Sequence, residues 1–205
     1  VAIVGEIFMR DNPFCSGFLV RKLENLGAET VMCPVKEWIS CSTLRFLRDS
    51  RWRGDWLGIV KSKIQAILQD AIGRRIEAVA HGVVDLQRDI PVKERFVLCD
   101  PYIHRDYDGD PPLAFGGAAG MVKTGISGVA NILPFTCLPG TLIASVSPTF
   151  RRDHENLPWV DIAFDGQEDT GIDTRLQAFV YQAKEYARKM GLDRIRTWPA
   201  ATSES

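Results

Sequence analysis

Cys137 is the residue of this chain whose type and surroundings are best suited to chemistry. It lies in the segment Ile132-Leu-Pro-Phe-Thr-Cys-Leu-Pro-Gly-Thr141. The apolar run 128–135 predicts a buried strand and 141–154 predicts a helix, so the cysteine is expected between the two. Unsatisfied N–H groups and the positive end of a helix dipole favour a thiolate there, and a thiolate is both a nucleophile and a ligand for soft metals. The alternative is a small residue packed in a turn.

The other four cysteines do not form a recognised metal-binding pattern. Cys33 and Cys41 are eight positions apart, and the sequence contains no CxxC spacing of the kind found in zinc ribbons and thioredoxin-like proteins. Cys15 follows the first predicted strand and is a possible second ligand beside Cys137, although a packed thiol is the simpler interpretation. Cys99 ends an apolar run and is expected in the core.

The elements that must position these residues follow an α/β pattern. Strands are predicted at 1–8, 29–34, 128–135 and 159–164, and helices at 18–26, 113–123, 141–154 and 172–190. We expect a parallel sheet of about four strands in the order 2-1-3-4, of the Rossmann or flavodoxin-like type. Ligands of such sheets bind outside the carboxyl ends of the strands, at the point where the strand order reverses.

Polar side chains follow three of these strands and are the candidate ligand-binding residues. They are Glu6, Arg10 and Asn12 after the first strand, Thr136 beside Cys137 after the third, and Asp165, Gln167, Glu168 and Asp169 after the fourth. Because parallel strands end at one edge of the sheet, we expect these groups to face one crevice. Capping of the last helix by Asp169, Thr170 or Asp173 is the competing interpretation of the final group.

The middle of the chain has a different periodicity. From Ser42 to Val84 the apolar residues recur at intervals of three and four, which predicts an inserted helical hairpin or small subdomain that covers or flanks the sheet and contributes no strand. We therefore divide the chain into a first βαβ unit (1–40), a helical insertion and loop (41–112), and a second βαβ half of the same domain (113–205).

Motifs for nucleotide chemistry are either incomplete or absent. The glycine-rich segment 116–125 lacks the glycine before the lysine that a phosphate-binding loop requires, and is expected to be a helix packed closely on the sheet. No GxGxxG follows the first strand, which argues against a dinucleotide site. His104-Arg-Asp106 has the form of a kinase catalytic triplet, but prolines follow where the metal-binding asparagine is needed.

Two stretches resemble a known family. The opening VAIVGEIFMRDNPFCSGFLVRKLENLGAETVMCPVKEWI, and the later GVANILPFTCLPGTLIAS followed by PWVDIAFDGQEDTGIDTRLQAFVYQAKEYARK, are similar to the large CoA-substrate-specific enzyme activases. They are more remotely similar to the iron–sulfur components of 2-hydroxyacyl-CoA dehydratases. The resemblance covers 1–40 and about 108–189, and much less of the middle. It implies that Cys137 is a ligand of a [4Fe–4S] cluster used in low-potential electron transfer.

The resemblance also sets expectations about context. Such a cluster takes three or four thiolates as a rule, so this chain alone is expected to bind little or no cluster. Val1 opens directly in an apolar strand pattern, which we interpret as a sign of a longer polypeptide whose other domains complete the cluster. The expected partners are those domains and an acyl-CoA dehydratase.

Composition narrows the class of protein. The 205 residues include 25 basic and 26 acidic side chains, so nothing indicates a nucleic-acid or anionic-membrane surface. No apolar stretch approaches the roughly 18 residues that span a bilayer. Five cysteines without a regular framework are typical of a reducing compartment, and we expect a cytoplasmic location.

Two alternatives to the iron–sulfur interpretation stay open: a docking domain without a cluster, and an α/β domain that binds a small anion at helix N-termini.

Overall fold

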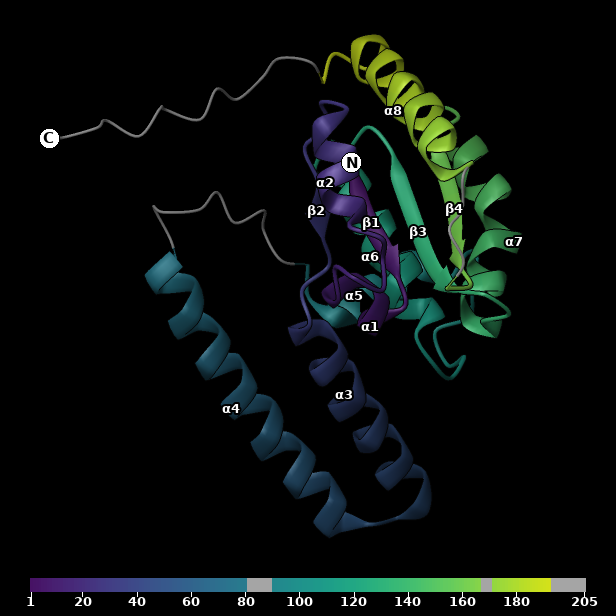
Figure 1. Ribbon diagram of the computed structural model, residues 1–205. Coiled ribbons are helices and arrows are strands. Elements are labelled where there is room, and N and C mark those ends of the chain that lie inside the picture. The colour runs from purple at the N-terminus through teal and green to yellow at the C-terminus, as the bar shows by residue number, and fades with distance from the viewer. Residues whose placement is uncertain (81–89, 167–170, 193–205) are drawn as a thin grey trace, which may run out of the picture.

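The described part of the chain forms one parallel sheet of four strands. The computed structural model describes residues 1–80, 90–166 and 171–192. Its strands are β1 (Ala2–Gly5), β2 (Val31–Met32), β3 (Val129–Pro134) and β4 (Trp159–Phe164), in the order β2-β1-β3-β4 (Figure 1). All three neighbouring strand pairs are parallel. The predicted fold class and strand order are therefore confirmed.

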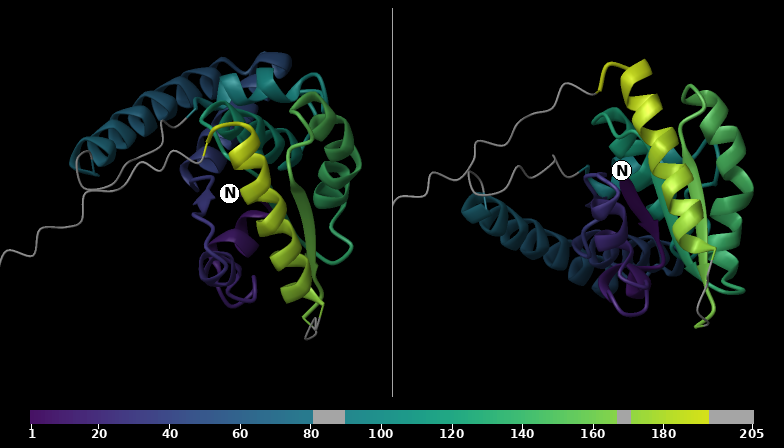
Figure 2. Two further views of the ribbon diagram at one scale, coloured as in Figure 1. Left: turned by 90° about the horizontal axis from the view of Figure 1, so that it is seen from above. Right: turned by 45° about the horizontal axis from the view of Figure 1, so that its top comes forward.

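The described part of the chain contains eight helices. They are α1 (Ile7–Asp11), α2 (Leu19–Asn25), α3 (Lys36–Arg53), α4 (Trp56–Ala80), α5 (Val92–Cys99), α6 (Pro111–Lys123), α7 (Leu138–Asp153) and α8 (Ile172–Lys189). Helices α2 and α8 cover one face of the sheet and α6 and α7 cover the other (Figures 1 and 2). The β1–β2 and β3–β4 connections run in opposite directions, so crossovers of one hand place their helices on opposite faces.

The core around the sheet consists of two layers because successive strand residues point to opposite faces. Val4 and Val129 pack with Phe115 and Phe150 under α6 and α7. The strand residues that point to the opposite face pack with Leu23 of α2 and Leu176 of α8. They are Ile3, Ala130, Ile132 and Ile162. A sheet buried on both faces explains why its strands read as almost continuous apolar runs in the sequence.

Helix α6 packs on the sheet as predicted, but Gly116 and Gly117 approach α5 and Cys33 instead of the strands. A Cβ atom at Gly116 would lie 2.2 Å from the backbone oxygen of Arg95 in α5. At Gly117 it would lie 2.7 Å from the Cys33 Sγ atom. The glycines thus serve close helix packing, which is the role that the sequence predicted in place of phosphate binding.

The first strand is shorter than predicted. It ends at Gly5, whose φ of +113° is unfavourable for other residues. The Glu6 carboxylate then accepts a hydrogen bond from the Met9 backbone N–H at 2.8 Å and caps α1. The prediction of a strand through residue 8 and a loop from Arg10 was therefore wrong, because a helix cap follows the apolar run directly.

Helices α3 and α4 form a hairpin that projects from the α/β body (Figures 1 and 2). The prediction of a helical excursion without a strand is confirmed as far as Ala80, and residues 81–84 of that prediction lie outside the described residues. The hairpin begins at Lys36, earlier than the predicted Ser42. The hairpin projects away from the sheet instead of covering it (Figure 1).

Strand β4 forms one outer edge of the sheet. Its Phe164 carbonyl faces β3, where it accepts from the Phe135 N–H at 2.9 Å, so the Asp161 carbonyl faces outward. The Arg175 guanidinium of α8 donates to that carbonyl at 2.5 Å. Within the ranges that the structure describes, no helix has the length and apolarity needed to cross a bilayer.

Candidate functional site

The carboxyl ends of β1, β3 and β4 lie side by side at one edge of the sheet. Gly5 is in register with Ile132, which is in register with Ile162. The Glu6 N–H donates to the Ile132 carbonyl at 3.0 Å. The loops that follow these strands therefore leave the sheet together, at the point between β1 and β3 where the strand order reverses.

Cys137 occupies the position before the first residue of α7. Its backbone N–H donates to the Pro134 carbonyl at 3.1 Å, and its carbonyl accepts from the N–H and the hydroxyl of Thr141 at 2.9 and 2.8 Å. The thiol is half-buried and does not cap the helix. A sulfur atom held at the start of a 16-residue helix is in the field of the helix dipole, which stabilises negative charge there.

Thr136 holds the turn between β3 and this cysteine. Its φ of +63° is an uncommon conformation for a β-branched residue. Its hydroxyl donates to the Phe135 carbonyl at 2.6 Å, so the side chain is used within the loop. Strained backbone of this kind is concentrated at functional sites, although the strain alone assigns no function.

The candidate residues after β1 make contacts that shape the backbone. Glu6 caps α1, and the Arg10 guanidinium, which is buried, donates to the Cys33 carbonyl at 2.7 Å. The Asn12 side-chain oxygen accepts from the backbone N–H groups of Phe14 and Cys15 at 3.1 and 3.2 Å. These contacts fix the α1–α2 connection at the edge where the strands end.

The two candidate thiols pack differently. Cys15 is half-buried against the core layer under α2 and α8, whereas Cys137 begins α7 on the other face of the sheet. Within the ranges that the structure describes, no three His, Cys, Asp or Glu side chains form a group that could hold a metal ion. Asp165 is exposed after β4, and Gln167, Glu168 and Asp169 lie outside the described residues.

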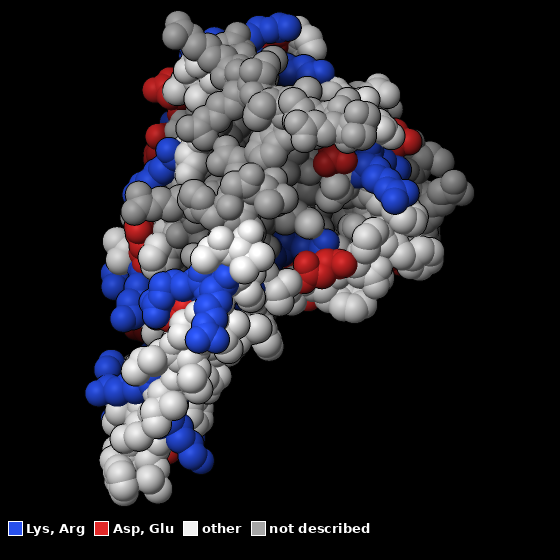
Figure 3. Space-filling view, turned by 90° about the vertical axis from the view of Figure 1, so that its left-hand side faces the viewer, with Lys and Arg blue, Asp and Glu red and all other residues white. Residues whose placement is uncertain are grey.

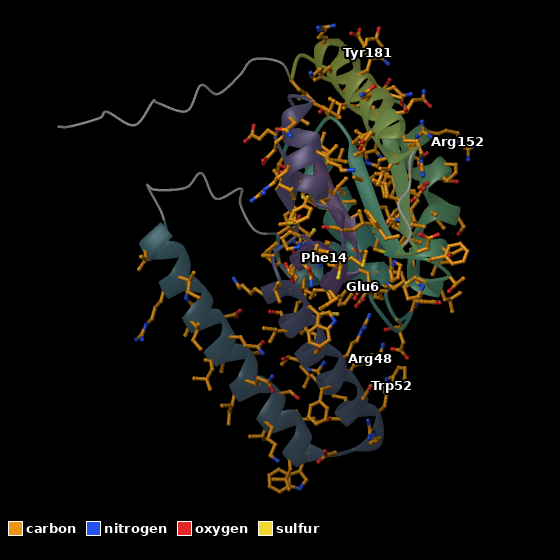
Figure 4. All side chains as sticks on the ribbon, viewed as in Figure 1. Glu6, Phe14, Arg48, Trp52, Arg152 and Tyr181 are labelled. Atoms are coloured by element: carbon orange, nitrogen blue, oxygen red, sulfur yellow. The ribbon has the colours of Figure 1, made fainter. Side chains whose placement is uncertain are left out.

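An apolar rim surrounds this edge of the sheet. It consists of four side chains that are between 61% and 81% exposed: Phe8 of α1, Phe14 of the α1–α2 connection, Phe135 of the β3–α7 turn and Leu138 at the start of α7. Figure 4 shows Phe14 and Glu6 at this end of the molecule, away from Tyr181 and Arg152. Phe135 and Leu138 flank Thr136 and Cys137 in the sequence, so apolar surface adjoins the thiol.

Sequence reasoning missed a second polar cluster, at the end of β2. The Arg95 guanidinium lies 2.6 Å from the Glu37 carboxylate and 3.5 Å from the Cys33 Sγ atom, and all three side chains are buried. Burial, together with the Glu37 carboxylate, raises the pKa of Cys33 to about 11 despite the nearby guanidinium groups. The thiol is therefore neutral at physiological pH, unlike a metal-binding or nucleophilic cysteine.

Comparison of the chain with protein-family models, curated proteins and solved structures finds no match.

Proposed function

We propose that this chain is a domain of a CoA-substrate-specific activase or 2-hydroxyacyl-CoA dehydratase-like system, in which Cys137 supplies one thiolate ligand to a [4Fe–4S] cluster. The observation that supports this most directly is the position of Cys137. The thiol is half-buried, leaves the helix uncapped and sits at the strand-order reversal of a parallel sheet. When bound, such a cluster supplies low-potential electrons for the radical dehydration of a CoA thioester.

The residues around Cys137 fit a ligand that is shared with other parts of a larger protein. The helix start favours the thiolate, and the exposed Phe135 and Leu138 provide apolar surface that a second domain would cover. Cover of this kind lowers solvent access to a cluster and so affects its reduction potential. Because the described residues contain no group of three potential ligands, the remaining thiolates would come from elsewhere.

The test is the iron and acid-labile sulfide content of the anaerobically purified full-length polypeptide, with EPR of its reduced form. Cys137→Ala should lower the iron content and change the EPR spectrum, because one thiolate is lost. Ser145→Ala, an exposed position further along α7, is the matched control and should leave both unchanged. Cys15→Ala tests the possible second ligand in the same measurement.

If the Cys137→Ala protein keeps its full cluster content and spectrum, the thiol is structural and the redox proposal must be abandoned. The domain would then be a docking module, for which the exposed rim of Phe8, Phe14, Phe135 and Leu138 is the supporting observation. Binding of a small anion at the start of α7 is the remaining alternative. Leu138 and Gly140 each have a backbone N–H group in the first turn of this helix, which could donate to an anion.

The proposed setting is the cytoplasm. All five cysteines are free thiols, which a reducing compartment maintains. The proposed partners are the other domains of the polypeptide and an acyl-CoA dehydratase, with which a low-potential cluster would exchange electrons.

A further inference from the structure

Helix α4 turns its small residues toward α3. Gly58 and Gly73 are buried, and Cβ atoms there would lie 2.4 Å from the Ser50 Oγ atom and 2.7 Å from the Lys36 Nζ atom of α3. Ser62 between them is fully buried. The two helices of the hairpin thus pack through small and polar groups, and their mutual contact leaves the large apolar residues of α4 unused.

Those large residues lie on the opposite face of α4, in solvent. They are Trp56, Leu57, Val60, Ile64, Ile67 and Leu68, and each is between 45% and 68% exposed. An ordinary surface helix shows the reverse arrangement, with its apolar stripe toward the protein. Figure 3 shows this side of the molecule, on which the projecting hairpin carries a long stretch without acidic side chains.

The spacing of the exposed residues is that of a helix–helix seam. The exposed Leu57, Val60, Ile64 and Ile67, followed by the half-buried Ala71, recur at intervals of three and four, which is the repeat of helices that pack in a coiled coil or four-helix bundle. We call these five residues the α4 seam. A seam of this kind takes another helix as its partner.

The charges beside the α4 seam match a second copy of the same helix. Lys63 and Asp70 are both exposed and seven residues apart, so they lie on one flank of the seam. When two copies pack antiparallel with Ile64 of one opposite Ile67 of the other, Lys63 of each copy lies near Asp70 of the other. Two-fold symmetry forms this contact twice.

The area is also sufficient for a dimer. Burial of one large aliphatic side chain removes on the order of 100 Å² from water, so the six exposed residues bring roughly 600 Å² per copy. A standard interface buries about 800 Å² per partner, and the flanking polar side chains supply the difference. Because α4 projects from the body, the second copy can approach without contact between the two sheets (Figure 1).

We propose that α4 is a homodimerisation helix, whose seam packs antiparallel on the seam of a second copy, with α3 of each copy on the far side of its own α4. This inference is independent of the function proposed for Cys137. It is tested by sedimentation-velocity ultracentrifugation and light scattering of the full chain over a range of concentrations, where a dimer is expected.

Two substitutions in the seam give the first test. Ile64→Glu together with Ile67→Glu should raise the dissociation constant at least about 100-fold, because unpaired carboxylates would be buried in the interface. Val97→Glu in α5 is the matched control, since this residue is 56% exposed and lies off the hairpin. Its dimer should be unchanged, and circular dichroism should show both variants folded.

Charge exchange gives the second test. Lys63→Asp and Asp70→Lys should each weaken the dimer, because like charges then meet twice, and the double variant should restore it. A wild-type chain that is monomeric at every concentration overturns the proposal, as does a dimer that tolerates the two glutamates. Failure of the double variant to restore association overturns the antiparallel arrangement. Binding of a monomeric chain to vesicles of anionic lipid through this face would replace the second copy with a membrane surface.

Discussion

The Arg95 Nη1 atom lies 2.6 Å from the Glu37 Oε2 atom, and the two side chains are only 5% and 2% exposed. Glu37 is in the first turn of α3 and Arg95 is in α5, so this buried ion pair joins the base of the projecting hairpin to the body. Arg95 also donates to the Ile90 carbonyl at 2.9 Å. A buried charge with several partners fixes the direction in which the hairpin leaves the domain.

Removal of Arg95 should destabilise the protein strongly. In Arg95→Met the Glu37 carboxylate is left in a buried position without its guanidinium, for which a loss of about 3–5 kcal/mol in the free energy of unfolding is typical. Urea denaturation measures this loss. Arg188→Met removes a guanidinium from the exposed pair with Glu185 in α8 and should change the urea midpoint little. Equal effects of the two substitutions would contradict the structural role of the buried pair.

The protein should lose stability at alkaline pH. Burial raises the pKa of Cys33 to about 11 and that of Cys99 to about 12, from an ordinary value of 9.0. Between about pH 9 and these values the folded thiols keep protons that the unfolded thiols lose, so stability falls as the pH rises. Each thiol contributes at most about 1.4 kcal/mol per pH unit.

Urea midpoints measured from pH 7 to pH 11 test this dependence. Cys99→Ala should show a shallower decline above pH 9 than the wild type, and the same slope near pH 7. A decline of equal steepness in both proteins would mean that Cys99 ionises as readily in the folded state as in the unfolded state.

Two helix glycines should respond oppositely to alanine. A Cβ atom at Gly116 meets the backbone oxygen of Arg95 at 2.2 Å, so Gly116→Ala must separate α5 from α6 and should destabilise the fold by about 1–3 kcal/mol. At Gly73 the new atom meets the flexible end of Lys36, which can move, and alanine favours the helix by up to about 1 kcal/mol. Thermal unfolding of the two variants measures both effects, and a loss of stability in Gly73→Ala comparable to that in Gly116→Ala would contradict this packing.

The Asp161 carboxylate should stabilise the fold by accepting hydrogen bonds from two buried or partly buried donors. The Asn131 Nδ2 and Trp159 Nε1 atoms both donate to its Oδ1 atom, at 2.8 and 2.9 Å. Asp161→Ala leaves these donors without that acceptor, at a cost of about 1–3 kcal/mol, whereas Asp161→Asn retains a carbonyl oxygen and should lose less. Equal losses in the urea unfolding of the two variants would show that the hydrogen bonds do not stabilise the fold.

The sequence predicted the sheet well because its strands are buried on both faces. The apolar runs at 128–135 and 159–164 match β3 and β4 to within one residue at each end. The long excursion between the second and third strands suits the observed strand order but does not dictate it, so that order was a guess. The end of β1 was harder, because Ile7 and Phe8 continue the apolar run while the Glu6 cap begins a helix. The backbone conformation of Gly5 distinguishes a strand that ends there from one that continues to Phe8.

The polar cluster at β2 could not be predicted from one sequence. Glu37 and Arg95 are 58 positions apart, and neither belongs to a motif with a fixed spacing. The position of Cys137 at a strand end was predictable from local pattern. The contact of Arg10 with Cys33 depends on tertiary packing, whereas Glu6 and Asn12 make local contacts within a short helix and turn that the pattern did not reveal.

The contact of Arg175 with the outer edge of β4 has a consequence for aggregation. An exposed edge strand can add a further strand through its free backbone groups, as in amyloid growth. The Arg175 guanidinium already occupies the outward carbonyl of Asp161, and a charged side chain there would have to be displaced before another chain could pair. Growth of the sheet from this edge is therefore hindered, and Arg175→Ala should shorten the lag time of thioflavin-detected fibril formation.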